Sequence, residues 1–227
     1  MRETSLILFS GGRDSSLAAC LEANAGRDLL LMTARTGATI ETDVVPLRVG
    51  EIVRSFPAVS VEHHLTHSAG IFRRVAIADI ESDFATYRTN LILLGHQMAI
   101  QCEGIALALH RNIKRVVSGF SSYQAHEYME QIPEAVAFSR EFFQSYGLQF
   151  ETPIEPYGTL DDVKFQLLDF GVTTKSLEAV SLFADSFSVA ETDAVTAYME
   201  SKLDVCRSYI KLKTGVDPSL RPGKTEQ

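Results

Sequence analysis

The most informative stretch of the chain is Ser5-Leu6-Ile7-Leu8-Phe9-Ser10-Gly11-Gly12-Arg13-Asp14-Ser15-Ser16. Its first five residues are largely apolar, which is typical of a strand covered on both faces of a parallel sheet. A glycine pair follows, and Leu17, Ala18 and Leu21 then recur at helical spacing before a stop at Gly26. This order of strand, glycine turn and helix predicts the start of an α/β fold.

The rest of the chain repeats the alternation of strand and helix. Strands are expected at 29–33, 59–65, 113–119 and 148–152, and helices at 44–55, 69–83, 91–111, 133–146 and 160–170. Elements of this length predict a doubly wound, about five-stranded parallel sheet with right-handed crossovers.

Beyond residue 174 the strand pattern fades, and 192–212 has the pattern of a long amphipathic helix. We therefore expect three parts. They are an α/β domain over 1–175, a helical appendage over 176–215 and a flexible tail over 216–227.

Composition and charge limit the classes of partner. The 227 residues are 45% hydrophobic and 22% charged, which is ordinary for a globular protein, and the net charge is −8. A negative net charge counts against broad capture of nucleic acid or anionic lipid, because both need a basic surface. The apolar stretch 91–109 includes His96, Gln97, Gln101 and Glu103, so we interpret it as a core helix rather than a membrane span.

Cellular location is predicted from the first residues and the cysteines. The apolar run 5–10 is too short for the core of a signal peptide. The three cysteines are far apart in sequence and form no C-x-x-C pair, which predicts neither a disulfide framework nor a cysteine-type zinc site. We expect a cytoplasmic protein, and the sequence leaves a homo-oligomer open.

The glycine turn between the first strand and the first helix has the chemistry of an anion site. Gly11 and Gly12 let backbone N–H groups approach a polyanion, and the helix that follows points its positive end at the same place. Ser10, Ser15 and Ser16 add hydroxyl donors to the predicted cofactor site. A carboxylate at position 14 is repulsive there unless it holds Mg²⁺. The alternative is that residue 14 or 15 only caps the helix.

The run S-G-G-x-D-S at positions 10–15 resembles the signature of the PP-loop ATP pyrophosphatases. That resemblance implies an adenine nucleotide α-hydrolase-like fold and cleavage of ATP between its α and β phosphates. It also implies that Ser10, Gly11, Gly12 and Ser15 hold pyrophosphate, and that Asp14 serves Mg²⁺ or the loop geometry. Arg13 fills the variable position and is expected to face solvent.

Within this superfamily the chain is most similar to 7-cyano-7-deazaguanine synthase, the PP-loop enzyme of queuosine biosynthesis. The resemblance rests on four runs, which are 87–94, 116–123, 150–154 and 167–172. The chain differs from that family in having Thr89 between Arg88 and Asn90, and in having only Cys206 where the family carries a cluster of zinc cysteines. We therefore expect a diverged member without zinc.

Further candidate residues follow the later strands. Loop 118–128 follows the strand expected beside the first one, so Ser121 and Tyr123 are candidates for substrate binding at the switch point, unless this is an ordinary solvated loop. Arg88 is a candidate catalytic residue and Asn90 a candidate substrate ligand, although an arginine at a helix start is as often a surface residue. Lys164 is a weaker phosphate candidate.

Histidines and cysteines have plainer interpretations. Neighbouring residues on a strand point to opposite faces, so His63 and His64 cannot easily share a metal ion. His96 and Cys102 are expected to pack in the core, and Cys20 to be buried in the first helix.

The leading functional prediction is an Mg²⁺- and ATP-dependent ligase that activates a substrate carboxylate as an adenylate. Ammonia or an amine then displaces AMP, and in the deazaguanine version a second ATP-driven step yields a nitrile. The alternatives are a tRNA-modifying PP-loop enzyme and a nucleotide-binding module without turnover.

Overall fold

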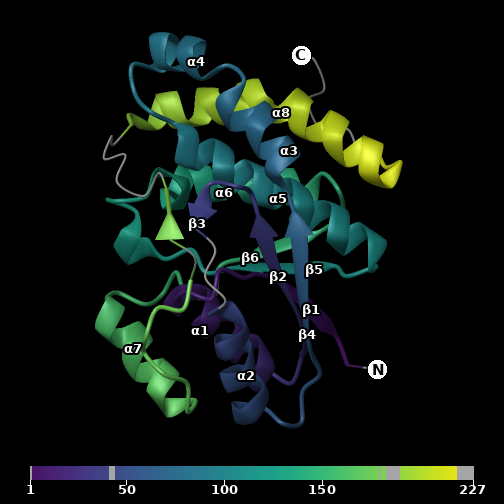
Figure 1. Cartoon of the computed structure of the whole chain (residues 1–227), viewed down its shortest axis with the longest axis vertical. Helices are drawn as coiled ribbons and strands as arrows, with labels where there is room; N and C mark the ends of the chain where they lie inside the picture. The colour runs from purple at the N-terminus through teal and green to yellow at the C-terminus, as the bar shows by residue number, and fades with distance from the viewer. Residues whose placement is uncertain (1, 41–43, 179, 183–189, 219–227) are drawn as a thin grey trace, which may run out of the picture.

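The computed structural model describes residues 2–40, 44–178, 180–182 and 190–218. Its central sheet has the order β4-β2-β1-β5-β6, and all four strand pairs are parallel. The strands are β1 (Thr4–Leu8), β2 (Asp28–Arg35), β4 (Val61–His67), β5 (Arg115–Ser118) and β6 (Gln149–Glu151). This arrangement confirms the predicted doubly wound, five-stranded parallel sheet (Figure 1).

The strand order places a switch point at β1. From β1 the chain builds outward through β2 and β4, and it then crosses back to lay β5 on the other side of β1. The loops that leave β1 and β5 therefore lie next to each other at the carboxyl edge of the sheet, which is where ligands bind in open α/β folds.

Helices cover both faces of the sheet (Figure 1). One face carries α1 (Arg13–Asn24), α2 (Val45–Ser55) and α7 (Leu160–Asp169), and the other carries α5 (Ile92–His110), α6 (Pro133–Gln144) and α8 (Thr192–Thr214). Leu6 and Leu8 of β1 belong to the core under α5, whereas Ile7 belongs to the core under α1. Consecutive side chains on a strand point to opposite faces, so the apolar run of β1 fills both cores.

The longest apolar helix is a core helix, as the sequence predicts. Among the described residues, α5 alone has the length and apolar composition to cross a membrane, and 67% of its most apolar window is buried inside the protein. It packs between the sheet and α8, and its buried polar residue Gln101 donates a 2.8 Å hydrogen bond to Ser139 of α6.

The structure divides the single helix predicted over 69–83 into three pieces. These are α3 (Ala69–Phe72), a π-helical turn η1 (Arg73–Ile77) and α4 (Ile80–Tyr87). The π turn brings Ala76 against Gly95 of α5, where a Cβ on the glycine would lie 2.7 Å from the Ala76 methyl. The Tyr198 hydroxyl also donates to the Val75 carbonyl there at 3.2 Å. Because α5 and α8 pack closely against this segment, a π-helical turn replaces the regular α-helix there.

A two-stranded antiparallel ribbon is the element that the sequence does not predict. β3 (Thr39–Ile40) pairs with β7 (Val180–Ser181). Strands of two residues carry no periodicity, so no pattern indicated them. The ribbon pairs residues that follow β2 with residues 180–181. The residues just before β7 contact the loop that follows β1, where the Leu177 N–H donates to the Gly11 carbonyl.

The C-terminal region is helical. α8 spans Thr192–Thr214 and ends at Gly215, which has the left-handed φ of 72°. Its buried residues, among them Tyr198 and Met199, share one hydrophobic cluster with the sheet. The domain boundary at 175 stays a prediction, and residues 219–227 of the predicted tail lie outside the described residues.

Candidate nucleotide site

The loop between β1 and α1 turns sharply at the predicted glycine pair. Phe9 still belongs to the sheet, since its N–H donates to the Met32 carbonyl at 2.8 Å. Gly11 follows with φ of 83°, a left-handed conformation that side chains disfavour, and α1 begins two residues later. The local sequence therefore determines the turn: a buried strand, a glycine that reverses the chain, and a helix.

Serine hydroxyls fix the shape of this loop. The Gly12 N–H donates to Ser10 Oγ at 3.1 Å, the Ser10 N–H donates to Ser15 Oγ at 3.3 Å, and Ser16 Oγ donates to the Gly12 carbonyl at 2.5 Å. Ser16 is fully buried behind the loop, whereas Ser10 is exposed in front of it. Ser15 is also buried, so of these three hydroxyls only that of Ser10 lies on an exposed residue, and contact of Ser10 and Ser15 with a nucleotide stays a prediction. Contact of Ser16 with a nucleotide stays a prediction.

The first turn of α1 has the donors of an anion site. Gly12 is the N-cap residue, and no side chain caps the helix. The interpretation in which Asp14 or Ser15 merely caps the helix is therefore wrong. The N–H groups of the first turn have no carbonyl partners within the helix, and the positive end of the helix dipole lies with them. These groups are suited to an oxyanion such as a phosphate.

Asp14 and Tyr123 come together over the loop. The Tyr123 hydroxyl donates to Asp14 Oδ1 at 2.7 Å, so the structure brings a predicted substrate residue to the predicted metal residue. Burial is the main cause that raises the pKa of the Asp14 carboxyl, the Tyr123 hydrogen bond opposes the rise, and the negative charge of Glu178 adds to it. The Asp14 carboxylate is the type of oxygen donor that Mg²⁺ takes beside phosphate oxygens, and its role as a metal ligand stays a prediction.

Gly119 allows the close approach of β5 to α1. A Cβ on Gly119 would lie 2.5 Å from the Ser15 nitrogen and 2.7 Å from the Asp14 carbonyl carbon. Ser121 is also buried in the loop after β5, where its N–H donates to Gln131 Oε1 at 2.8 Å. It therefore orders the loop, and substrate contact by Ser121 stays a prediction.

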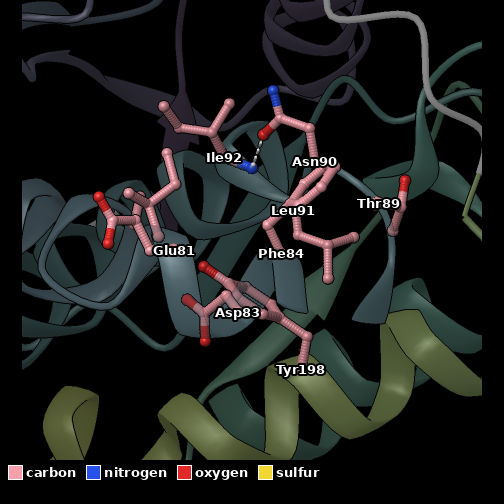
Figure 2. Close-up of a pocket in the computed structure, with 10 residues that line it drawn as sticks. Glu81, Asp83, Phe84, Thr89, Asn90, Leu91, Ile92 and Tyr198 are labelled. Carbon is pink, nitrogen blue, oxygen red and sulfur yellow. Dashed lines mark hydrogen bonds between the residues drawn. The ribbon is translucent and has the colours of Figure 1, made fainter. Parts of the chain in front are cut away.

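Arg88 and Asn90 lie elsewhere. Arg88 is exposed at the end of α4 with the left-handed φ of 57°, and Asn90 accepts the Ile92 N–H through Oδ1 at 3.0 Å at the start of α5. Asn90 lines a cavity of about 390 Å³ between α4, α5 and α8, together with Phe84, Tyr198 and others (Figure 2). The cavity lining includes no residue of the 10–16 loop. The roles of Arg88 and Asn90 stay predictions.

A segment that the sequence did not single out crosses the loop. We call residues Thr173–Glu178 the strap. Arg48 of α2 has no exposed surface, and it donates to the Thr173 carbonyl at 2.6 Å and to the Lys175 carbonyl. Arg13 Nε donates to the Thr174 carbonyl at 2.7 Å. Arg13 was expected to face solvent, but its side chain is half-buried and contacts the strap. A buried arginine in an amphipathic helix gives no local signal of this role.

Histidines and cysteines offer no metal cluster in the part of the chain that the structure describes, where no three metal-binding side chains gather. His63 shares a 2.9 Å hydrogen bond with Thr33 Oγ1, and His96 shares one of the same length with Thr36 Oγ1. Burial lowers the pKa of His96 to about 4, so it is neutral at pH 7. Cys20 and Cys102 are buried as predicted. The absence of zinc stays a prediction.

Known proteins resemble this chain in fold and not in sequence. No family model matches the chain, and no curated protein matches its sequence. A 4-thiouridine synthetase, solved in complex with RNA and with bound ATP, is similar with a TM-score of 0.65 at 13% identity, over 94% of this chain and 53% of that chain. This chain thus spans about half the length of that protein.

A predicted subunit of tRNA methyltransferase from Methanocaldococcus jannaschii is similar with a TM-score of 0.45 at 12% identity, over 79% of this chain and 96% of that chain. The second likeness is too weak to carry an argument. The first confirms the adenine nucleotide α-hydrolase-like fold.

Proposed function

We propose that the chain is a PP-loop enzyme that binds ATP at residues 10–15 and cleaves it to AMP and pyrophosphate. The observation that carries this proposal is the uncapped first turn of α1, which meets Gly11 and Gly12 at the switch point of the sheet. Backbone N–H groups at such a place bind phosphates without requiring a basic surface. The fold shared with an ATP-bound 4-thiouridine synthetase supports the same assignment.

The loop acts on the leaving group in this reaction. An oxygen of the acceptor attacks the α phosphorus, the bond from that phosphorus to the oxygen bridging the α and β phosphates breaks, and pyrophosphate leaves with the electron pair. The N–H groups of α1, with Ser10 and Ser15, bind the β and γ phosphates and stabilise the charge that develops on them. Asp14 would hold Mg²⁺, which supplies further neutralisation of the phosphates. Tyr123 orients the Asp14 carboxylate through its hydrogen bond.

For the acceptor, we place a carbonyl oxygen of an RNA base ahead of the carboxylate of a free deazaguanine. The fold relative was solved with RNA, which favours tRNA modification. Two observations count against the deazaguanine acceptor. Thr89 separates Arg88 from Asn90 in sequence, and the cavity that Asn90 lines includes no residue of the 10–16 loop. The net charge of −8 requires that RNA contact be confined to a local surface.

We propose that the nucleophile that displaces AMP is not a cysteine thiol of this chain. Burial raises the pKa of Cys20 to about 12, and burial also raises the pKa of Cys102, so neither thiol provides a thiolate at pH 7. Cys206 has no exposed surface and cannot meet a substrate. Ammonia, an amine or an external sulfur donor is therefore the expected nucleophile. The cytoplasmic location and the oligomeric state stay predictions.

Nucleotide analysis tests this function. The protein is incubated with ATP and Mg²⁺, with either unmodified tRNA or a panel of heteroaromatic carboxylates plus ammonia, and the nucleotides are separated by chromatography. AMP is expected as the product, and Ser10→Ala is expected to lower the rate by about 10- to 100-fold because one donor to the leaving group is lost. Ser201→Ala on α8 is the matched control.

The products distinguish the alternatives. ADP as the main product would refute cleavage at the α phosphorus, since γ-phosphoryl transfer yields ADP. Nucleotide binding without AMP under any acceptor would favour the binding module. AMP with carboxylates and not with tRNA would restore the deazaguanine-like acceptor.

A further inference from the structure

The strap lies directly on the glycine turn of the loop. The Leu177 N–H donates to the Gly11 carbonyl at 3.2 Å. A Cβ at Gly11 would lie 2.2 Å from the Leu177 carbonyl oxygen, so the strap backbone fills the space that a side chain would need. Gly11 is thus required twice, by its left-handed φ and by the passage of the strap.

The carboxylate at the end of the strap faces the donors of the loop. Glu178 Oε2 lies 3.4 Å from Ser10 Oγ, and a Cβ on Gly12 would lie 2.5 Å from the same oxygen. Ser176 Oγ donates to Glu178 Oε1 at 2.6 Å and holds the carboxylate in this orientation. A carboxylate and a phosphate are both oxyanions that accept the same hydrogen bonds, so Glu178 lies where the loop would receive a phosphate.

The two ends of the strap are held by separate parts of the fold. Arg48 binds the carbonyls of Thr173 and Lys175 at one end, and Thr173 Oγ1 donates to Glu51 Oε1 at 2.9 Å. At the other end the chain enters β7, which pairs with β3. The Glu178 side chain between them is exposed. Movement of this side chain and its peptide can therefore clear the loop while both ends of the strap stay in place.

We propose that the strap is an autoinhibitory contact, in which Glu178 competes with the phosphates of the nucleotide for the loop. The inference rests on the proposed function in that it takes a polyphosphate as the displacing ligand. A nucleotide must then displace the Glu178 carboxylate before it binds. Its apparent affinity is the intrinsic affinity multiplied by the fraction of molecules in which the loop is uncovered. The negative charge of Glu178 also repels an incoming polyphosphate.

Calorimetry with the full chain tests the competition. The probes are inorganic pyrophosphate and a non-hydrolysable ATP analogue, each with and without Mg²⁺. Glu178→Gln keeps an acceptor for Ser176 and removes the charge, and it is expected to bind both probes about tenfold more tightly than the wild type. Asp204→Asn removes a carboxylate that is 97% exposed on α8, and it serves as the charge-matched control with unchanged affinity.

Amide hydrogen exchange supplies a second measurement. The Leu177 N–H donates to the loop in the ligand-free protein, and its protection is expected to fall when pyrophosphate binds to the wild type. Equal affinity of Glu178→Gln and the wild type, or protection of Leu177 that ligand leaves unchanged, would overturn the proposal. Weaker binding by Glu178→Gln would also overturn it, because Glu178 would then assist binding, as a metal ligand does.

The results separate this inference from the proposed function. Tighter binding by Glu178→Gln without any AMP production would support the strap and contradict the enzymatic function. AMP production together with equal affinities of Glu178→Gln and the wild type would support the enzymatic function and contradict the strap proposal. No binding of either probe by the wild type or by the variant would overturn both.

Discussion

Replacement of Gly119 by alanine tests whether the contact between β5 and α1 positions the loop. The added Cβ would lie 2.5 to 2.8 Å from three backbone atoms of residues 14 and 15, where ordinary contact begins at 3.4 Å. Backbone atoms cannot rotate away, so the first turn of α1 must move by about 0.9 Å, the difference between 2.5 and 3.4 Å. Gly119 does not have a positive φ, so the effect is steric and not conformational.

Two consequences of the Gly119→Ala substitution can be measured. Overpacking of this kind costs about 1–3 kcal/mol in the free energy of unfolding, which urea denaturation reports. Displacement of catalytic groups by about 1 Å lowers turnover by about 100-fold, and AMP production reports that loss. Gly70→Ala is the control, because no atom lies within 4 Å of its Cβ position. If Gly119→Ala matched the wild type in stability and in AMP production, the contact would not position the loop.

Three further predictions concern charges around the sheet. Tyr123→Phe is expected to raise the pKa of Asp14 further, because the lost hydrogen bond lowers it, and an NMR titration that shows no rise would contradict this. Arg48→Met is expected to lower the free energy of unfolding by about 2–4 kcal/mol in urea, since the strap carbonyls and Glu51 lose the fully buried donor that Arg48 supplies, and a loss below about 0.5 kcal/mol would show that the anchor is unimportant. Burial alone would raise the pKa of Glu22, but the hydrogen bonds from Arg115 and Ser5 and the charges of Arg115 and Arg27 together outweigh it and hold that pKa below 4.5. The resulting stabilisation is present above pH 4.5 and is lost as pH falls through the lower folded pKa, so Glu22→Gln is expected to lower the melting temperature at pH 7 more than at pH 3.

The strand, turn and helix of residues 4–24 could be predicted from the sequence because their causes are local. The apolar run of β1 requires two covered faces, Gly11 permits the left-handed turn, and helical spacing follows at once. The same local rules predicted the other sheet strands and α5. They failed at η1, where packing of Ala76 against Gly95 replaces the regular helix.

Contacts between distant residues could not be predicted in this way. The hydrogen bond from Tyr123 to Asp14 forms because β5 lies beside β1. The expected strand order placed the two loops near each other, but only the structure shows the contact. Asn90 resembles a family motif in sequence, yet its side chain accepts a hydrogen bond at the start of α5 and lines a separate cavity.

The sequence by itself determined the glycine turn between β1 and α1, because strand burial, glycine conformation and helix polarity are set by neighbouring residues. Only the tertiary structure decided what covers that turn. Glu178 reaches Ser10 from 168 positions along the chain, held by a buried arginine on another helix and by a strand pair of two residues. No local pattern encodes such a contact, because its energy arises from groups that meet only after the sheet has assembled.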